Sequence, residues 1–148
     1  MQIHNLKISR FKWFFLVKEL RRRGNNERES GAFLLGKVDN VIISDILYYD
    51  DLDPKSLDEG YIRFRGEGYV KLWEYCREKG LMVLADVHTH PGIWTGQSEL
   101  DRTHPMIAQK GHIALIVPNY AKKLFQFLKG VGIFKYLGSH KWEVISER

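Results

Sequence analysis

The stretch that decides the fold is Leu81-Met-Val-Leu-Ala-Asp-Val-His-Thr-His-Pro91, which joins an apolar run to a pair of histidines. Its first seven residues have the length and composition of a buried strand. Residues two apart in an extended chain point to the same side, so His88 and His90 present both imidazoles to one face. Pro91 keeps His90 extended, because the residue before a proline is disfavoured in a helix. The stretch therefore predicts two adjacent imidazoles where a buried strand ends.

A second short motif, Ser98-Glu-Leu-Asp101, follows at the start of a predicted helix over residues 98–110. By itself this motif is typical of a helix-capping box, and a single histidine is usually an ordinary hydrogen-bonded one. In combination, His88, His90 and Asp101 supply three ligands and leave the fourth tetrahedral position open, as hydrolytic zinc requires. The combination predicts a site for one Zn²⁺, and Ser98 can serve both as a cap and as an active-site hydroxyl.

A hydrolytic zinc site also needs a base outside the ligand set, and Glu29 is the candidate. It stands at the entrance of an apolar strand predicted over residues 31–38, seven positions before Gly36. Taken alone, such a carboxylate is more often simply solvated. Together with the downstream motif, the pattern resembles the JAMM zinc metalloproteases, also called the MPN-plus or JAB-domain family, in its compact prokaryotic form.

The resemblance implies a role for each of these residues. His88, His90 and Asp101 would hold zinc, Glu29 would act on the zinc-bound water as general acid and base, and Ser98 would steady the oxyanion. The chain departs from the family pattern at one point. Many members have glycine three residues after the glutamate, whereas this chain has Ala32 there and Gly31 one place earlier. This departure leaves Glu27 as a competitor for the role of base.

The remaining pattern predicts an α/β fold, a mixed β-sheet flanked by helices. The resemblance implies one MPN/JAB metalloprotease domain over residues 1–148, with the α/β/α arrangement of cytidine deaminases. A helix is predicted over 10–23, and the apolar spacing along it predicts an inner face made of Phe11, Phe14, Phe15, Val17 and Leu20. A further helix is predicted over residues 68–79, and strands over 2–8, 41–49, 61–65, 112–117, 124–128, 133–137 and 142–145.

The substrate follows from the resemblance only. It implies an isopeptidase that cleaves after the tail of ubiquitin or a ubiquitin-like protein, in partnership with bacterial-type activating and conjugating enzymes. Trp94, on the loop between the ligands, and His104, one helical turn after Asp101, are candidate substrate-binding residues. A hydrolase of small sulfur-carrier or amino-acid adducts is the alternative, and a scaffold or a nucleic-acid-binding module is the non-enzymatic one.

The composition of the chain bears on the other classes of enzyme and on the kinds of partner that it could have. A zinc deaminase needs His-x-Glu and a pair of cysteines, but the chain has a single cysteine, Cys76, which also excludes an internal disulfide. The net charge of +5 is uneven, with a basic stretch over residues 7–28 and an acidic one over 45–59. A solvated basic face is the commoner outcome, so we expect no nucleic-acid partner. With no long apolar run and no secretory signal, we expect a cytoplasmic protein without a membrane partner; its oligomeric state stays open.

Overall fold

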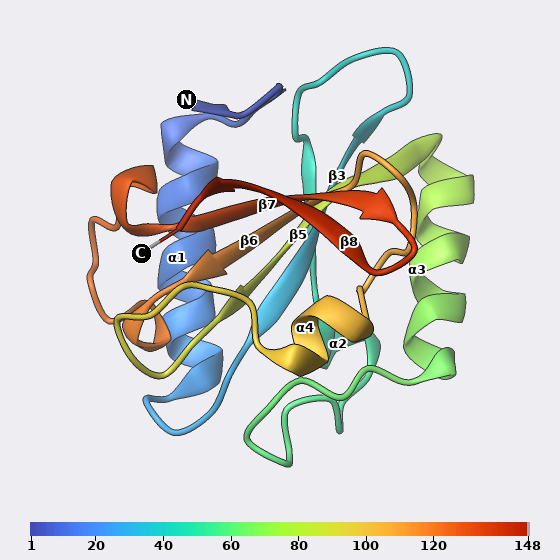
Figure 1. Ribbon diagram of the computed structural model, residues 1–148. Coiled ribbons are helices and arrows are strands. Elements are labelled where there is room, and N and C mark those ends of the chain that lie inside the picture. The colour runs from blue at the N-terminus through green and yellow to red at the C-terminus, as the bar shows by residue number, and fades with distance from the viewer. Residues whose placement is uncertain (148) are drawn as a thin grey trace.

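A six-stranded mixed sheet forms the centre of the protein in the computed structural model, which describes residues 1–147 (Figure 1). The strand order is β4-β3-β5-β6-β7-β8, in which β5 and β6 are parallel and the other neighbours antiparallel. A two-stranded hairpin of β1 and β2 precedes it. The strands are β1 (Gln2–Ile3), β2 (Leu6–Lys7), β3 (Gly31–Lys37), β4 (Asp45–Tyr48), β5 (Leu81–Thr89), β6 (Ile113–Val117), β7 (Gly132–Gly138) and β8 (Lys141–Ser146).

Helices cover both faces of this sheet, as predicted. Helix α1 (Arg10–Gly24) packs on one face, and α2 (Tyr49–Leu52) and α3 (Gly66–Lys79) pack on the other (Figure 1). The short helix α4 (Glu99–Thr103) follows β5, and two 3₁₀ turns, η1 (Asn119–Ala121) and η2 (Leu128–Gly130), lie between β6 and β7. Within residues 1–147, no helix has the length and apolar character needed to cross a bilayer.

One extra residue in β5 determines which face its side chains occupy. Leu34 pairs with Ala85 and Leu35 with Val83, so Leu84 is a bulge. The bulge reverses the alternation of side chains. Val83 therefore packs in the cluster beneath α3, whereas Ala85 packs in the cluster beneath α1.

Several predicted elements are wrong in extent. The helix predicted over 98–110 ends at Thr103, because His104 leaves the helical conformation ahead of Pro105. Residues 61–65 and 124–128 are not strands, and β4 begins at Asp45 rather than at residue 41. The strand β4 ends at Tyr48, and Tyr49 begins the short helix α2.

The inner face of α1 is only partly the predicted one, because Val17 and Leu20 are buried but Phe11 and Phe15 are not. The buried side chains of the helix are Trp13, Leu16, Val17 and Leu20. Phe11 and Phe15 lie on the outer side, where they are 75% and 54% exposed. Apolar residues occur on two sides of this helix, so their spacing alone did not identify the side that meets the sheet.

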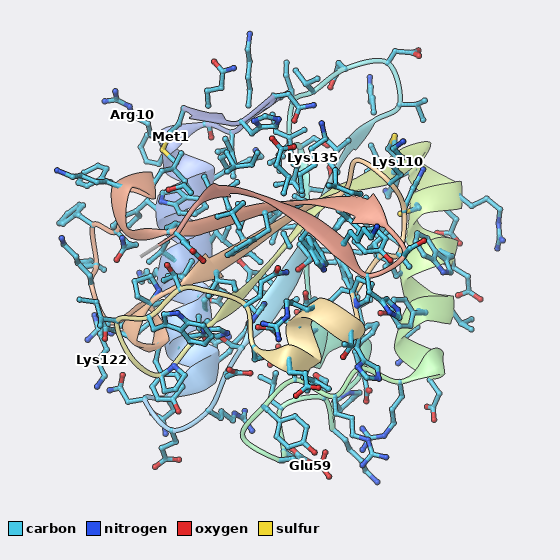
Figure 2. All side chains as sticks on the ribbon, in the orientation of Figure 1. Met1, Arg10, Glu59, Lys110, Lys122 and Lys135 are labelled. Carbon is cyan, nitrogen blue, oxygen red and sulfur yellow. The ribbon has the colours of Figure 1, made fainter. Side chains whose placement is uncertain are left out.

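The basic and acidic stretches of the sequence meet at the end of α1. The guanidinium of Arg23 lies 3.0 Å from Asp50 and 2.9 Å from Asp51, and it stacks on the Tyr48 ring. Part of the positive charge is therefore neutralised inside the protein. Other charges remain apart: Glu59 lies at the lower end of the molecule and Lys135 in its upper half (Figure 2).

We predict that Gly31→Ala destabilises the fold. A methyl group at this position of β3 would lie 2.3 Å from the ring of Tyr49 and 2.6 Å from the carbonyl oxygen of Val87. Both neighbours belong to the packed interior, so the free energy of unfolding should fall by about 1–3 kcal/mol, measured by urea denaturation. Gly66→Ala is the control, because nothing lies within 4 Å of the added methyl group. Equal stability of the two variants would contradict the close approach.

Candidate metal centre

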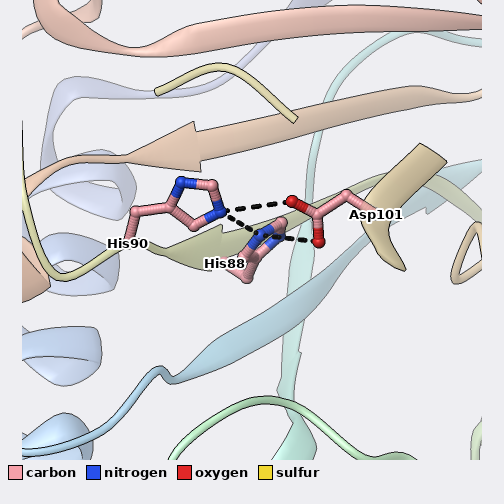
Figure 3. A group of neighbouring side chains, drawn as sticks. All are labelled: His88, His90 and Asp101. Carbon is pink, nitrogen blue, oxygen red and sulfur yellow. Dashed lines mark hydrogen bonds and ion pairs between the residues drawn. The ribbon is translucent and has the colours of Figure 1, made fainter. Parts of the chain in front are cut away.

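Three side chains from two elements converge at the end of β5 (Figure 3). The Nε2 atoms of His88 and His90 lie 3.1 Å apart. In Asp101, Oδ1 lies 3.4 Å from Nε2 of His88, and Oδ2 lies 3.2 Å from Nε2 of His90. The imidazoles are buried and the carboxylate is half-buried, so the donor atoms face one another in a largely dry site.

The spacing of these atoms fits a tetrahedral metal ion. Zinc bonds of about 2.0–2.1 Å at tetrahedral angles place neighbouring ligand atoms roughly 3.3–3.4 Å apart. The observed separations of 3.1, 3.2 and 3.4 Å, the last two of which end on different carboxylate oxygens of Asp101, are close to this spacing. Two imidazoles and one carboxylate also form a donor set that zinc uses in open, water-binding sites.

Backbone hydrogen bonds fix both histidines. The N–H of Thr89, which lies between the two histidines, donates to the carbonyl of Ser30, just before β3, at 2.9 Å. The His90 N–H donates to the Val117 carbonyl of β6, also at 2.9 Å. The Nδ1–H of His90 donates to the carbonyl of Trp94 at 3.2 Å. Because a carbonyl can only accept, this bond leaves Nε2 as the nitrogen that faces Asp101, with a lone pair available to a metal ion.

Asp101 is oriented by the cap of α4. Its carboxylate accepts the Ser98 backbone N–H at 3.0 Å, and the Ser98 hydroxyl accepts the Asp101 N–H at 3.0 Å. The capping box predicted from the sequence is therefore present. It points the carboxylate at the histidines, and the Ser98 hydroxyl keeps its own proton for another acceptor.

Glu29 lies beside this cluster. It precedes β3, where Gly31 pairs with His88, and its backbone N–H donates to the Gly60 carbonyl at 2.8 Å. Its carboxylate accepts a hydrogen bond from the Ile62 backbone and interacts electrostatically with the two histidines and Asp101. Glu27, the competitor left open by the sequence, is exposed. The structure therefore brings Glu29 to the histidines.

The charges of the site perturb one another. Burial acts to lower the pKa of His88, but the hydrogen bond and charge of Asp101, with the charge of Glu29, raise it to about 9. Burial acts to raise the pKa of Asp101, yet the two imidazoles hold it well below its usual range. Burial raises the pKa of Glu29. Two carboxylates beside two imidazoles favour positive charge in the site. In the metal-free protein this charge is the protonated imidazole of His88.

A cavity of about 500 Å³ adjoins the ligands on the α3 face of the sheet. His104 lines it, which is consistent with the predicted place of this residue beside the site. Trp94 does not; it is 54% exposed, and its ring stacks on His90 with centroids 5.6 Å apart. The wall is formed by Tyr49, Tyr61, Ile62, Arg63, Phe64, Tyr69, Asp86, His88, Gln97, Leu100, Asp101, His104, Pro105, Met106, Ala114, Ile116 and Trp142.

Sequence reasoning missed two polar groups in this cavity region. Asp86 accepts a hydrogen bond from Nε2 of His112 at 2.6 Å, and both side chains are 3% exposed. The hydroxyl of Tyr49 is buried without a protein partner within residues 1–147. Asp86 stands two residues before His88, so the alternation of side chains along a strand could have placed it on the same face as His88. Tyr49 comes from a distant segment, and no motif marks it.

The fold of the chain is similar to that of several solved structures. A JAB1/MPN domain protein from Archaeoglobus fulgidus matches with a TM-score of 0.53 and 17% identity, over 97% of this chain and 96% of that one. The chain has the JAB1/MPN fold. Two further solution structures agree with it, one from Desulfitobacterium hafniense (TM-score 0.62, 14% identity, 93% and 87% covered) and one from Salinibacter ruber (0.55, 14%, 95% and 89%). The fold class predicted from the sequence is confirmed.

Sequence comparison points in the same direction. A probable metalloprotease of Sinorhizobium fredii is 36% identical over 58 residues, which are 39% of this chain. The match spans about a third of that relative, 34% of its length. No family model matches the chain. The resemblance to the JAMM/MPN family is thus supported by one short sequence match and by the fold.

We predict that the protein binds one zinc ion per chain and releases about one proton on binding. At about pH 7.5 the metal-free His88 is protonated, because its pKa is about 9, and a bound metal ion must displace that proton. Affinity should therefore rise with pH up to about 9. Calorimetry in buffers of different ionisation enthalpy measures the released proton. Binding that strengthens as the pH falls would contradict this arrangement.

We predict different effects for the two residues of the capping box. Asp101→Ala removes one of three ligands and should abolish stoichiometric zinc binding. Ser98→Ala removes a cap but no ligand, so it should retain zinc while losing about 1 kcal/mol of stability. Elemental analysis and thermal melting of both purified variants test this. If Ser98→Ala also loses its zinc, the hydroxyl is required to hold Asp101 in place.

Proposed function

We propose that this chain is a zinc-dependent peptidase of the JAMM type. The observation that carries the proposal is the triangle of donor atoms on His88, His90 and Asp101, with Glu29 beside it outside the ligand set. The Sinorhizobium relative, named as a probable metalloprotease, supports the same class of reaction. Three ligands leave a position for water, and zinc lowers the pKa of that water towards neutrality.

The residues around the ligands have distinct tasks in this mechanism. Glu29, whose pKa is raised by burial, takes the proton of the attacking water and delivers it to the departing amine. The free proton of the Ser98 hydroxyl is available to the oxyanion that forms on the carbonyl. Trp94 keeps His90 in the correct orientation through its carbonyl and its stacked ring.

The proposed substrate is the tail of a ubiquitin-like protein, in a conjugate or a precursor. An extended tail can add alongside exposed backbone at the site. The irregular segment 61–64 lines the cavity beside His88 and Asp101, which supports binding of a tail along it. The partners would then be bacterial-type activating and conjugating enzymes. The single buried cysteine agrees with a reducing compartment, for which we propose the cytoplasm.

A second candidate function is favoured by the size of the cavity. About 500 Å³ is within the range of small-molecule sites, so a hydrolase of small sulfur-carrier or amino-acid adducts also fits. Cleavage assays distinguish the two candidates. Zinc-loaded protein is mixed with ubiquitin-like proteins encoded near its gene, as linear fusions, as isopeptide conjugates and as single amino-acid adducts. Cleavage of none of them, by protein that contains zinc, would favour the scaffold or nucleic-acid-binding alternatives.

We predict that Glu29→Gln keeps zinc and the fold but lowers cleavage by about two to four orders of magnitude, because the amide cannot accept a proton. The measurement is turnover of the best substrate from the panel above, with zinc content determined on the same sample. Glu27→Gln is the matched control and should retain full activity, since Glu27 is exposed. An inactive Glu27→Gln beside an active Glu29→Gln would assign the base to the other residue.

A further inference from the structure

A group of exposed aromatic rings lies on the outer side of α1. Phe11 and Phe15 are 75% and 54% exposed, and Phe125 and Phe127, after β6, are 61% and 65% exposed. The ring of Phe14 connects them, with centroids 5.7 Å from Phe15 and 5.5 Å from Phe125. We call this surface the phenylalanine patch; it consists of Phe11, Phe14, Phe15, Leu124, Phe125 and Phe127.

The patch is a fixed part of the fold. The indole N–H of Trp13, on the buried side of α1, donates to the carbonyl of Gln126 at 2.6 Å. This buried bond holds residues 124–127 against the helix, so rings from both segments face outward together. A groove of about 520 Å³ lies between them, with Met1 and Arg10 at its border. Apolar surface of this kind marks a contact with a partner or a membrane.

The charge around the patch is of one sign. The two segments that carry the patch, residues 1–18 and 119–131, contain seven of the 23 lysines and arginines and none of the 18 acidic residues. Met1, Arg10 and Lys122 lie on the α1 side of the molecule, away from α3 (Figure 2). Six exposed cations stand within four positions of a patch residue, and none pairs with a carboxylate of residues 1–147: Lys7, Arg10, Lys18, Lys122, Lys123 and Lys129.

We propose that the phenylalanine patch is a peripheral binding surface for an anionic membrane. Its rings enter the boundary between headgroups and acyl chains, and its cations contact lipid phosphate and carboxylate groups. Five of the six cations are lysines, whereas specific protein interfaces favour arginine and are poor in lysine. A second copy of the chain is a poor occupant, because the cations of the two patches would face each other.

This inference is independent of the proposed peptidase activity. It also departs from the sequence-based expectation of no membrane partner. That expectation rested on the lack of a membrane-spanning segment, and a peripheral contact needs no such segment. The sequence placed Phe11, Phe14 and Phe15 on the inner face of their helix. The structure turns Phe11 and Phe15 outward, and the patch is visible only from that arrangement.

The test is co-sedimentation of the full-length, zinc-loaded protein with vesicles of phosphatidylcholine, alone or with about one third phosphatidylserine. We expect binding to the acidic vesicles only, weakened by salt. Phe11→Ser/Phe125→Ser and Lys122→Glu/Lys123→Glu should each lower the partition coefficient by about tenfold or more. The matched controls are Val70→Ser/Val144→Ser, 56% and 54% exposed, and the exposed pair Lys37→Glu/Lys71→Glu. All four double variants are checked for an unchanged melting temperature.

Three outcomes would overturn the proposal. The first is no binding of the natural chain to acidic vesicles at low salt. The second is binding that the control variants weaken as much as the patch variants do. The third is a dimer in light scattering that Phe11→Ser/Phe125→Ser dissociates, which would assign the patch to a second copy of the chain. Because none of these measurements uses cleavage, an inactive protein would leave the test intact.

Discussion

Two imidazoles and two carboxylates share a small volume at the end of β5, and the surrounding structure is organised to keep them there. Like charges on Glu29 and Asp101 repel unless positive charge stands between them. The imidazoles supply it in the metal-free protein, which is why the pKa of His88 rises to about 9. A divalent cation satisfies both carboxylates better than one proton does, and it frees the imidazoles to act as ligands.

Each element next to the site contributes one constraint on these four groups. The bulge at Leu84 sets the alternation of β5, which places Asp86 and His88 on the α3 face of the sheet, where the cavity lies. The capping box of α4 directs Asp101 at the histidines without a long helix behind it. Gly31 lets β3 approach Tyr49 closely, and the chain just before it carries Glu29. The site is therefore assembled from strand register and helix capping rather than from a flexible loop.

The sequence predicts the grouping of His88, His90 and Asp101 but not the cavity beside them, and the difference has a physical cause. His88 lies near the end of β5 and His90 directly after it, and Ser98 and Asp101 lie at one helix start, so local periodicity is enough to predict their geometry. The bulge is hidden, because every residue from Leu81 to Ala85 is apolar and either face would accept it. Tyr49 and the segment 61–64 reach the site through long-range packing, which no local pattern records. For α1, apolar residues on two sides made the inner face ambiguous.

The two faces of the sheet have separate surface chemistry. The cavity opens on the α3 face, where His88 and Asp101 stand among many apolar and aromatic side chains, whereas the phenylalanine patch lies on α1, which covers the opposite face. Arg23 separates the two regions electrostatically, since its pairing with Asp50 and Asp51 neutralises the end of α1 nearest to α2. The unpaired cations consequently remain around the rings, away from the carboxylates of the metal site. A bilayer or partner seated on the patch would leave the cavity accessible to substrate, so the two surfaces can be occupied at the same time.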